Sequence, residues 1–326
     1  MRILVTGGAG YIGSCVANLL LDEGYEVHIV DNFSTGSRSL LPPKAKIYEL
    51  DIGFELKITK LLKKIAPKVV IHFAGSVEVE ESMINPLKYY DNNIAKSIIF
   101  MKSCINANVE NFIFSSTAAV YGFSDKKIPI KEDAYKEPQS PYGSSKLILE
   151  DLIKEVSSKF KFKSLVFRYF NVAGADKKLR TGQIKDPATH LIKIACEVAC
   201  GKRENISIFG NDYSTFDGTC IRDYIHVSDL AELHLLGTEY LCNGGKSKIL
   251  NCGYGVGFSV LEVINKVKEI SKNNFEVLIK PRRKGDPEFL VANSELCKKI
   301  LDWVPKHNKL DEIIKDSLEW EKKLKF

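Results

Sequence analysis

The N-terminal stretch of the chain constrains its fold more strongly than any other. An apolar run of strand length, Arg2–Thr6, leads into the turn Gly7-Gly8-Ala9-Gly10-Tyr11-Ile12-Gly13, and a helical pattern follows. A second strand, Glu26–Val30, ends at Asp31. Glycines allow a tight turn and a close approach to a pyrophosphate, the helix N-terminus favours the anion, and the acid can accept hydrogen bonds from an adenosine ribose. The segment therefore predicts dinucleotide binding by Gly7, Gly10, Gly13 and Asp31.

The acid at the end of the second strand also indicates which dinucleotide is bound. The negative charge of Asp31 would repel the 2′-phosphate that distinguishes NADP from NAD. We therefore expect NAD as the cofactor.

Strands and helices continue to alternate through the first half of the chain. Further strands are expected at Lys46–Leu50, Lys68–Phe73, Asn111–Ser115 and Ser164–Tyr169, and helical patterns lie between them, including a long one from Leu87 to Ala107. This alternation predicts an α/β fold with a doubly wound parallel sheet, in which ligands bind at the carboxyl ends of the strands. Four candidate residues fall at or just past such ends: Asp31, Asp51, Gly75 and Thr117.

After about Asn171 the pattern loosens into shorter strands, longer loops and helices expected at 189–200, 259–272 and 310–325. We expect residues 1–170 to form a Rossmann-like NAD-binding domain, to which residues 230–255 return. Residues 171–326 are expected to form a smaller C-terminal α/β domain that binds the substrate, interleaved with the first.

Charge and cysteine usage exclude several classes of function. The 47 basic and 41 acidic residues give a net charge of +6 without any block of like charge, so neither nucleic acid nor a membrane surface is an expected partner. No apolar run approaches the ~20 residues of a membrane span, and no secretory signal is expected before the first strand. The eight cysteines lack zinc-like spacing, so no metal is expected and a reducing cytoplasm is favoured.

The segment Ser140-Pro141-Tyr142-Gly143-Ser144-Ser145-Lys146 is the candidate centre of the chemistry. Ser140 suits a helix N-cap and Pro141 the first helical position, so Tyr142 and Lys146 lie one turn apart on one helical face. A nearby ammonium lowers the pKa of a phenol, which makes Tyr142 a candidate general base. Such a pair is a weak signal alone, but Thr117 adds a hydroxyl after the fifth strand, beside the expected dinucleotide.

Over essentially its whole length the chain resembles the extended short-chain dehydrogenase/reductases, and within them the UDP-glucose 4-epimerases. The glycine turn and the Tyr142/Lys146 pair mark the superfamily. The runs more specific to the epimerases are Ile208-Phe209-Gly210-Asn211-Asp212-Tyr213, Asp217-Gly218-Thr219, Arg222-Asp223-Tyr224-Ile225-His226-Val227 and Pro281-Arg282-Arg283-Lys284-Gly285-Asp286.

The resemblance implies a role for each member of the catalytic constellation. Tyr142 would take the proton from the sugar 4-hydroxyl, with Thr117 as its hydrogen-bonding companion, and Lys146 would lower the pKa of the phenol and hold the nicotinamide ribose. NAD would accept a hydride from C4 of a UDP-hexose and return it to the other face of the 4-keto sugar after the hexose has rotated.

The resemblance also implies a set of binding residues. Those for the cofactor, besides the glycines and Asp31, are Tyr11, Ile12, Asn32, Asp51, Ile52, Phe73, Ala74, Gly75, Asn92, Tyr142, Lys146 and Phe170. Those for the UDP-hexose are Thr117, Asn171, His190, Arg222, Arg283, Asp286 and Leu290.

Several positions depart from the family pattern. Thr117 stands where serine is frequent, which keeps the hydroxyl, and Ser76-Val77 replaces a lysine that commonly contacts the cofactor. Leu290 aligns with a position that is tyrosine in some members and cysteine in others, so acceptance of N-acetylated hexoses stays open. His190 stands where some members have asparagine, and a packed histidine and a UDP contact are both compatible with it.

The sequence also bears on two rival functions and on one assembly. A nucleotide-sugar 4,6-dehydratase or decarboxylase is the nearest rival, but a dehydratase needs an acid/base pair directly after Thr117, where Ala118-Ala119 cannot move a proton. A non-catalytic NAD-binding regulator would not need the phenol. The apolar helices Leu87–Ala107 and Tyr142–Phe160 are expected to pair across a two-fold axis, which predicts a homodimer.

Overall fold

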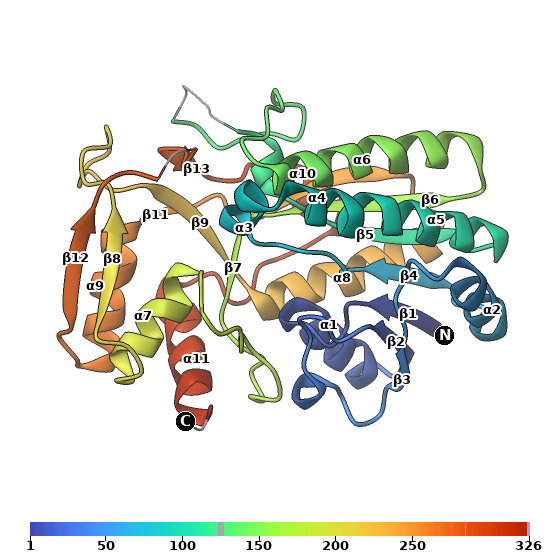
Figure 1. Ribbon diagram of the computed structural model, residues 1–326, viewed down its shortest axis with the longest axis horizontal. Coiled ribbons are helices and arrows are strands. Elements are labelled where there is room, and N and C mark those ends of the chain that lie inside the picture. Colours follow the sequence, from blue (N-terminus) through green and yellow to red (C-terminus); the bar gives the residue numbers. More distant parts are fainter. Residues whose placement is uncertain (123–126, 284, 325–326) are drawn as a thin grey trace.

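The computed structural model describes residues 1–122, 127–283 and 285–324, and Figure 1 shows them as two unequal parts. A large sheet with its helices lies to the right in that view, and a smaller part with β8, β12, α7, α9 and α11 lies to the left. Lys284 of the run 281–286 and Lys325, the predicted end of the last helix, fall outside the described residues.

The large sheet has seven strands in the order β10-β6-β5-β4-β1-β2-β3. Every neighbouring pair is parallel, so the predicted doubly wound α/β fold is confirmed. The strands are β1 Arg2–Thr6, β2 Glu26–Asp31, β3 Lys46–Glu49, β4 Val69–His72, β5 Asn111–Thr117, β6 Lys163–Tyr169 and β10 Lys248–Cys252. The direction of winding reverses between β1 and β4, which places a ligand crevice at the carboxyl ends of these two strands.

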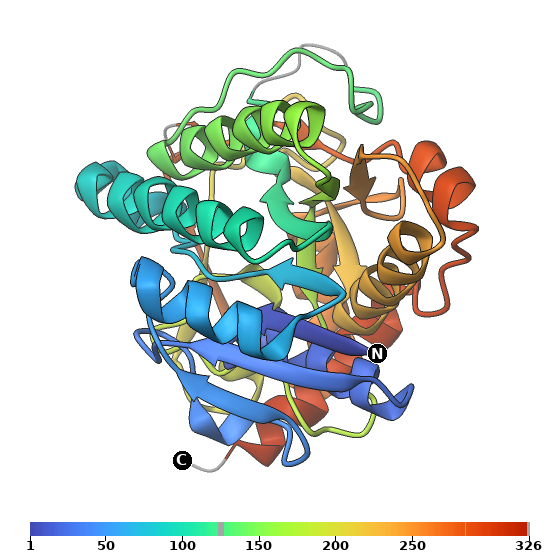
Figure 2. The ribbon, with the colours of Figure 1, turned by 90° about the vertical axis from the view of Figure 1, so that its right-hand side faces the viewer.

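The alternation of side chains along the strands supplies both faces of the sheet with core residues. Ile3 and Val5 of β1 belong to the core on one face with α1 and α8, while Leu4 belongs to the core on the other face with α2, α5 and α6. Figure 2 shows the resulting layers of helices on both sides of the sheet. The helices are α1 Tyr11–Asp22, α8 Val227–Cys242, α2 Glu55–Ile65, α5 Lys96–Asn106 and α6 Pro141–Lys159.

The long helix expected from Leu87 to Ala107 is wrong as a single α-helix. A short helix, α4 Pro86–Tyr89, is followed by a π-helical segment, Tyr90–Ala95, before α5 begins at Lys96. The wider turn of a π-segment turns side chains off the regular helical stripe, and such segments occur frequently at functional sites. An apolar spacing of three and four residues cannot distinguish this arrangement from a continuous helix.

The smaller part is built on two small sheets and three helices. Strand β9 Ile221–His226 is the centre of one sheet, in which it pairs with β7 Asn171–Ala173, β11 Gly257–Ser259 and β13 Phe289–Leu290. β8 Asn205–Phe209 and β12 Glu276–Lys280 form the other, a parallel pair. The helices α7 Leu191–Ala199, α9 Val260–Ser271 and α11 Leu310–Lys323 pack together, and α10 Glu295–Leu301 packs on β10.

The chain crosses between the two parts more than once. After β9, helix α8 packs against α1 and strand β10 pairs with β6, so residues 227–252 return to the large sheet. This path supports the interleaved division at residues 1–170, 230–255 and 171–326, which stays a proposal.

Candidate active site

The glycine turn forms a cradle in which side chains would not fit. Gly7 has a φ of +69°, and a Cβ atom there would lie 2.7 Å from the backbone nitrogen of Ala74. A Cβ atom on Gly13 would lie 2.4 Å from the carbonyl oxygen of Gly7. Gly10 is the N-cap of α1 and offers no side chain, so the amides of the first turn have no side-chain acceptor. Close backbone approach with amides directed at an anion is what a pyrophosphate requires, so these residues fit a dinucleotide.

The acids after β2 and β3 are fixed by hydrogen bonds beside this cradle. Asp31 is buried and accepts hydrogen bonds from the amide nitrogens of Ala9, at 2.9 Å, and Phe33, at 2.8 Å. Asp51 accepts from the side-chain nitrogen of Asn32 at 2.8 Å and from that of Lys96 at 2.9 Å. Burial would raise the pKa of Asp51, but these hydrogen bonds outweigh it and lower the pKa. The structure therefore brings three predicted cofactor residues to one edge of the sheet.

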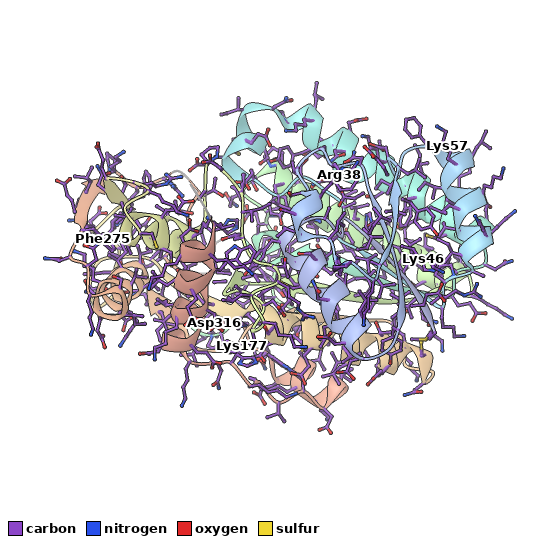
Figure 3. All side chains as sticks on the ribbon, turned by 90° about the horizontal axis from the view of Figure 1, so that it is seen from below. Arg38, Lys46, Lys57, Lys177, Phe275 and Asp316 are labelled. Atoms are coloured by element: carbon purple, nitrogen blue, oxygen red, sulfur yellow. The ribbon has the colours of Figure 1, made fainter. Side chains whose placement is uncertain are left out.

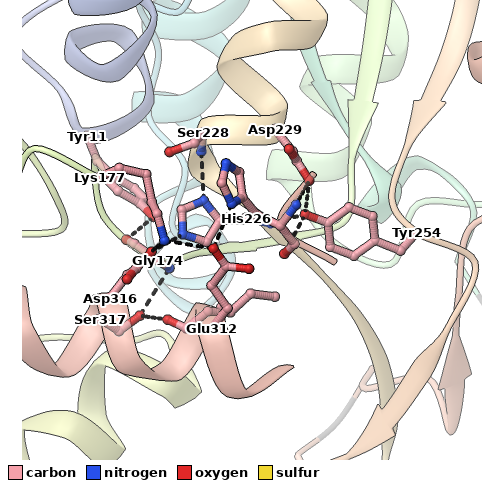
Figure 4. Close-up of polar contacts among 12 residues, drawn as sticks. Tyr11, Gly174, Lys177, His226, Ser228, Asp229, Tyr254, Glu312, Asp316 and Ser317 are labelled. Carbon is pink, nitrogen blue, oxygen red and sulfur yellow. Dashed lines mark hydrogen bonds and ion pairs between the residues drawn. The ribbon is translucent and has the colours of Figure 1, made fainter. Parts of the chain in front are cut away.

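Polar contacts also tie the cradle to the smaller part of the molecule. The hydroxyl of Tyr11 donates to the carbonyl oxygen of Gly174 at 2.7 Å, and the amide of Gly174 donates to Ser317 Oγ on α11 at 3.0 Å. Nearby, buried His226 contacts Asp316 Oδ2 through Nε2 at 3.0 Å, as Figure 4 shows. Viewed from below, Lys177 and Asp316 lie together at the same junction (Figure 3), where their ion pair measures 2.8 Å.

The expected catalytic segment begins a helix as its sequence indicates. Ser140 is the N-cap of α6, where its side chain accepts from the amide of Gly143 at 3.1 Å, and Pro141 is the first helical residue. Tyr142 is partly buried, and its ring meets the ring of Tyr89 edge-on at 6.4 Å. Thr117 is the last residue of β5, not a residue after it, and its hydroxyl oxygen accepts from the amide of Ala119 at 3.1 Å.

Burial governs the proton affinity of the catalytic phenol in this structure. The pKa of Tyr142 is raised to about 12, mainly by burial; a hydrogen bond with Thr117 lowers it and the negative charge of Glu78 adds to the rise. The hydroxyl groups of Tyr142 and Thr117 are therefore hydrogen-bonded to each other, as the resemblance implies. The lowering of the Tyr142 pKa by Lys146 that the sequence predicts does not appear here: besides burial, the groups that shift this pKa are Thr117 and Glu78.

Lys146 points into the protein beneath the candidate site. Its side chain is 2% exposed, and Nζ donates to the carbonyl oxygen of Ser115 at 2.9 Å. Burial lowers the pKa of the Lys146 ammonium to about 8, although Glu150, one turn later on α6, raises it. A Cβ atom on Gly75 would lie 3.6 Å from Nζ, so the loop after β4 passes directly by the ammonium.

The π-helical segment holds that loop, a role that the sequence analysis missed. Buried Asn93 accepts from the amide of Ser76 at 2.7 Å, donates to the carbonyl oxygen of Ser76 at 3.0 Å and donates to Ser145 Oγ at 3.0 Å. Asn92, predicted to contact the cofactor, donates to Ser76 Oγ at 3.1 Å. The adjacent asparagines were the available signal, and the π geometry explains how both reach one loop.

Six further predicted cofactor residues lie just past strand ends or in the first turn of α1. Phe73 follows β4, and its ring lies tilted against the ring of His234 with the centroids 4.9 Å apart, while Ala74 next to it closes on Gly7. Phe170 follows β6, is buried and lies 6.5 Å from the ring of Tyr121. Ile52, after β3, is buried in the core on the α2 side of the sheet. Tyr11 and Ile12 form the first turn of α1.

Residues predicted to hold the substrate lie on the facing, smaller part. Asn171, the first residue of β7, and His190, the N-cap of α7, line one small cavity together with Gln183 and Tyr224. The His190 side chain is exposed, so it is not a packed core histidine. Leu290 lies in β13 and packs against the buried cluster that contains Ala118 and Phe170. These residues are thus near the strand ends that carry the catalytic group.

The two predicted arginines are engaged with carboxylates. Arg222 on β9 lies 3.8 Å from Asp286, which joins two predicted substrate residues, and the Arg222 side chain is largely buried. Arg283 packs over the ring of Phe209 at 3.8 Å and pairs with Glu80 at 3.1 Å. Glu80 is carried by α3 Val79–Ile84, a helix that the sequence analysis did not predict.

Two structural observations bear on other classes of site. Within the described ranges of the chain, no three or more His, Cys, Asp or Glu side chains are grouped as a metal would require. Searching the same ranges finds no helix with the length and apolar character of a bilayer span.

Comparison with known proteins gives the family. The model of the NAD dependent epimerase/dehydratase family matches residues 3–253. The chain belongs to this family. The resemblance stated from the sequence is thereby confirmed, and NAD is the cofactor of the family, as expected from Asp31.

Members of the NAD dependent epimerase/dehydratase family match the chain almost end to end. A UDP-glucose 4-epimerase of Azospirillum brasilense is 46% identical over 99% of this chain and 92% of its own length. The UDP-glucose 4-epimerase of Brucella ovis in complex with NAD has a TM-score of 0.94 at 38% identity, covering 98% of this chain and 97% of that one. The UDP-Glc/GlcNAc 4-epimerase of Campylobacter jejuni has a TM-score of 0.86 at 41% identity, covering 99% of both chains.

Proposed function

We propose that the protein is an NAD-dependent UDP-glucose 4-epimerase, which interconverts UDP-glucose and UDP-galactose. The observation that carries this proposal is the convergence of Thr117, Tyr142 and Lys146 at the strand ends that also hold the glycine cradle. A phenol with a hydroxyl partner beside a dinucleotide suits removal of a proton from a sugar hydroxyl while a hydride leaves the same carbon. The named relatives carry the same activity over nearly the same length of chain.

Each catalytic residue has a definable task in this proposal. Tyr142 takes the proton from the 4-hydroxyl and later returns it, and Thr117 keeps the phenol oriented through their hydrogen bond. Lys146 places a positive charge beneath the site and is expected to bind the nicotinamide ribose once its contact with Ser115 is shared. NAD, when bound, supplies the acceptor and donor of the C4 hydride. Because every turnover restores the cofactor, no external oxidant is needed.

The smaller part is proposed to hold the UDP moiety. Arg222 and Arg283 present planar, permanently charged groups, which suit the oxygens of a diphosphate better than lysine does. Asn171 and His190 meet at one cavity on the same side of the site. Asp286, near Arg222, would orient that arginine and accept from a ribose hydroxyl.

The test of the proposed function is direct conversion of substrate. Purified protein is incubated with UDP-galactose, and the nucleotide sugars are resolved by chromatography. We expect UDP-glucose to appear without added NAD, because the cofactor stays bound. Protein shown by absorbance to carry NAD, yet leaving UDP-galactose unchanged, would contradict the proposal.

N-acetylated UDP-hexosamines are proposed as second substrates. The Campylobacter jejuni enzyme, whose name gives both UDP-Glc and UDP-GlcNAc, is 41% identical to this chain. Leu290 is of intermediate size at the position expected to meet the hexose, and it leaves more room than a tyrosine would. The same incubation with UDP-N-acetylgalactosamine tests this, and a product rate below one hundredth of that with UDP-galactose would count against it.

The residues around Thr117 argue against both rival functions, the nucleotide-sugar 4,6-dehydratase or decarboxylase and the non-catalytic NAD-binding regulator. Ala118 and Ala119 begin a single 3₁₀ turn after the strand, so no carboxyl group stands there to eliminate water across C5 and C6. A non-catalytic regulator would have no use for a phenol whose hydroxyl is bonded to Thr117.

A homodimer and a cytoplasmic location complete the proposal. Apolar side chains stay exposed on α4, α5 and α6, among them Leu87, Ile98 and Ile148, as a helix-pairing surface requires. The eight cysteines are unpaired, which suits a reducing compartment.

A further inference from the structure

One largely buried carboxylate near Tyr142 has no task in the proposed reaction. Glu78, the residue before α3, has a side chain only 17% exposed. It forms an ion pair with Lys185, whose side chain is 40% exposed. Lys185 lies in the segment that leads to α7, so the pair joins the loop after β4 to the smaller part of the molecule.

Contacts on the loop side place Glu78 beside the catalytic phenol. The amide of Glu78 donates to the hydroxyl of Tyr89 at 3.0 Å, and the ring of Tyr89 meets Tyr142 edge-on. Helix α3 packs on α6 directly. Glu78 is close enough for its charge to raise the pKa of Tyr142.

On the far side, the partner of Glu78 belongs to the substrate wall. Lys185 lies between Gln183 and His190, which both line the cavity with Asn171. A second pair, Arg283 with Glu80 of α3, also joins the loop side to the smaller part, but the Glu80 side chain is 69% exposed, far more than that of Glu78. Exposed pairs contribute little, whereas removing the lysine that pairs with a largely buried carboxylate leaves that carboxylate without its compensating charge.

We propose that Glu78 and Lys185 are a pair of positioning residues, which hold segment 183–190 against the sugar end of the site and so set the affinity for the UDP-hexose. This inference rests on the proposed function for the identity of the ligand. Glu78 acts through Lys185 and segment 183–190, and through its charge it also affects the phenol. No covalent step is added to the reaction.

The test compares Glu78→Gln, Lys185→Met and the double variant as NAD-loaded full-length proteins. Calorimetry with UDP-galactose measures affinity whether or not turnover occurs, and steady-state rates give kcat and KM. We expect each single variant to weaken the affinity and raise KM about five-fold, the equivalent of about 1 kcal/mol. The double variant should be no weaker than the worse single variant, because both remove the same pair.

A pH profile separates positioning from general support of the fold. The titratable groups around the phenol are Glu78 before α3, Tyr89 on α4, Tyr169 on β6 and Lys146 on α6 itself, and of these the charge of Glu78 raises its pKa. Without the carboxylate of Glu78, the acidic limb of the kcat/KM profile should shift to lower pH by about half a unit. The shift is expected because one negative charge that raises the pKa of the phenol is gone. Lys185→Met leaves that carboxylate in place and should not shift the acidic limb to lower pH.

The matched control is Glu110→Gln. This change removes a carboxylate that pairs with Lys68, at 3.7 Å, before the amino ends of β4 and β5. Its affinity and pH profile should match those of the unaltered protein. Unchanged affinity in both single variants, losses that add in the double variant, or an acidic limb that stays fixed in Glu78→Gln would overturn the inference. Absence of turnover with intact binding would instead count against the proposed function.

Discussion

The proposed chemistry depends on the phenolic hydroxyl of Tyr142 as its general base. Tyr142→Phe keeps the ring against Tyr89 and removes only the oxygen. We expect NAD and UDP-sugar binding to persist, while turnover falls by about 100- to 10,000-fold, the usual contribution of a general base. Chromatographic assay of UDP-galactose conversion checks this. Near-normal turnover would show that another group accepts the proton.

Lys146 illustrates a residue retained for chemistry at the expense of stability. Burial lowers the pKa of its ammonium to about 8 from an ordinary value near 10.5, so the unfolded chain holds the proton more tightly. The resulting destabilisation is complete below pH 8 and is relieved as the pH rises from 8 toward 10.5. We expect Lys146→Met to stabilise the cofactor-free protein at pH 7 by about 1–3 kcal/mol and to abolish turnover.

Denaturant unfolding of both proteins at pH 7 and pH 10 measures this effect of Lys146. The difference in unfolding free energy between the unaltered protein and Lys146→Met should shrink at pH 10, because the side chain at position 146 is then neutral in both folded proteins. A variant less stable than the unaltered protein at both pH values would mean that the contact with Ser115 outweighs the burial of charge.

The residues of the site differ in how much of their structure and role the sequence could predict. The N-cap at Ser140 and the Tyr142/Lys146 spacing were readable, because the signals lie within one helical turn. The direction in which Lys146 points depends on its contact with Ser115 of β5, and the pKa of Tyr142 depends on burial by elements distant in the sequence. The partners Glu78 and Lys185 are joined only by the folded chain, and no local pattern marks either of them.

At the scale of elements, one buried ion pair joins the catalytic helix to the sheet. Glu150 of α6 and Arg168 of β6 are both fully enclosed, and Arg168 Nε lies 3.0 Å from Glu150 Oε1. Arg168 also donates to the hydroxyl of Tyr121 at 2.8 Å. We expect Glu150→Ala to destabilise the protein by about 3–5 kcal/mol, since it leaves a buried guanidinium without its carboxylate.

Denaturant unfolding of Glu150→Ala tests this estimate, with Glu150→Met/Arg168→Met as the matched comparison. The double variant removes both charges and should recover part of the loss, because no charge then stays unpaired. If the loss of unfolding free energy in the double variant equals the sum of the losses in Glu150→Met and Arg168→Met, the pair does not act as a unit.

The elements themselves were predicted best where periodicity was long. The strands from β1 to β6 appear at or within a residue or two of the expected bounds, because buried apolar runs identify them. Helix α3 was missed because its six residues are too few for a periodic signal, and it has no side-chain N-cap. The π-segment Tyr90–Ala95 was missed because Asn93 is placed by its contacts with Ser76 and Ser145, which are not local.

At the scale of the whole molecule, the proposed dimer predicts a mass. Helices α4, α5 and α6 lie in one layer (Figure 1), and they carry Leu87, which is 77% exposed, and the exposed Ile98 and Ile148. We expect sedimentation at micromolar concentration to give twice the chain mass, and Leu87→Lys with Ile98→Lys to shift the protein toward monomer. The matched control Ile279→Lys changes an exposed apolar residue on β12 and should stay dimeric. A monomer for the unaltered protein would discard the proposal.

The return of β10 to the sheet has a consequence for how the protein is made. On a ribosome, a nascent polypeptide that has emerged only through β6 exposes that strand's outer hydrogen-bonding groups, since residues 248–252 have not yet been synthesised. An open strand edge can recruit foreign strands. During the translation of the intervening stretch, roughly 80 codons at about 5–20 per second, the immature chain is vulnerable to aggregation. Chaperone dependence should therefore be greatest in that interval and end when the seventh strand docks.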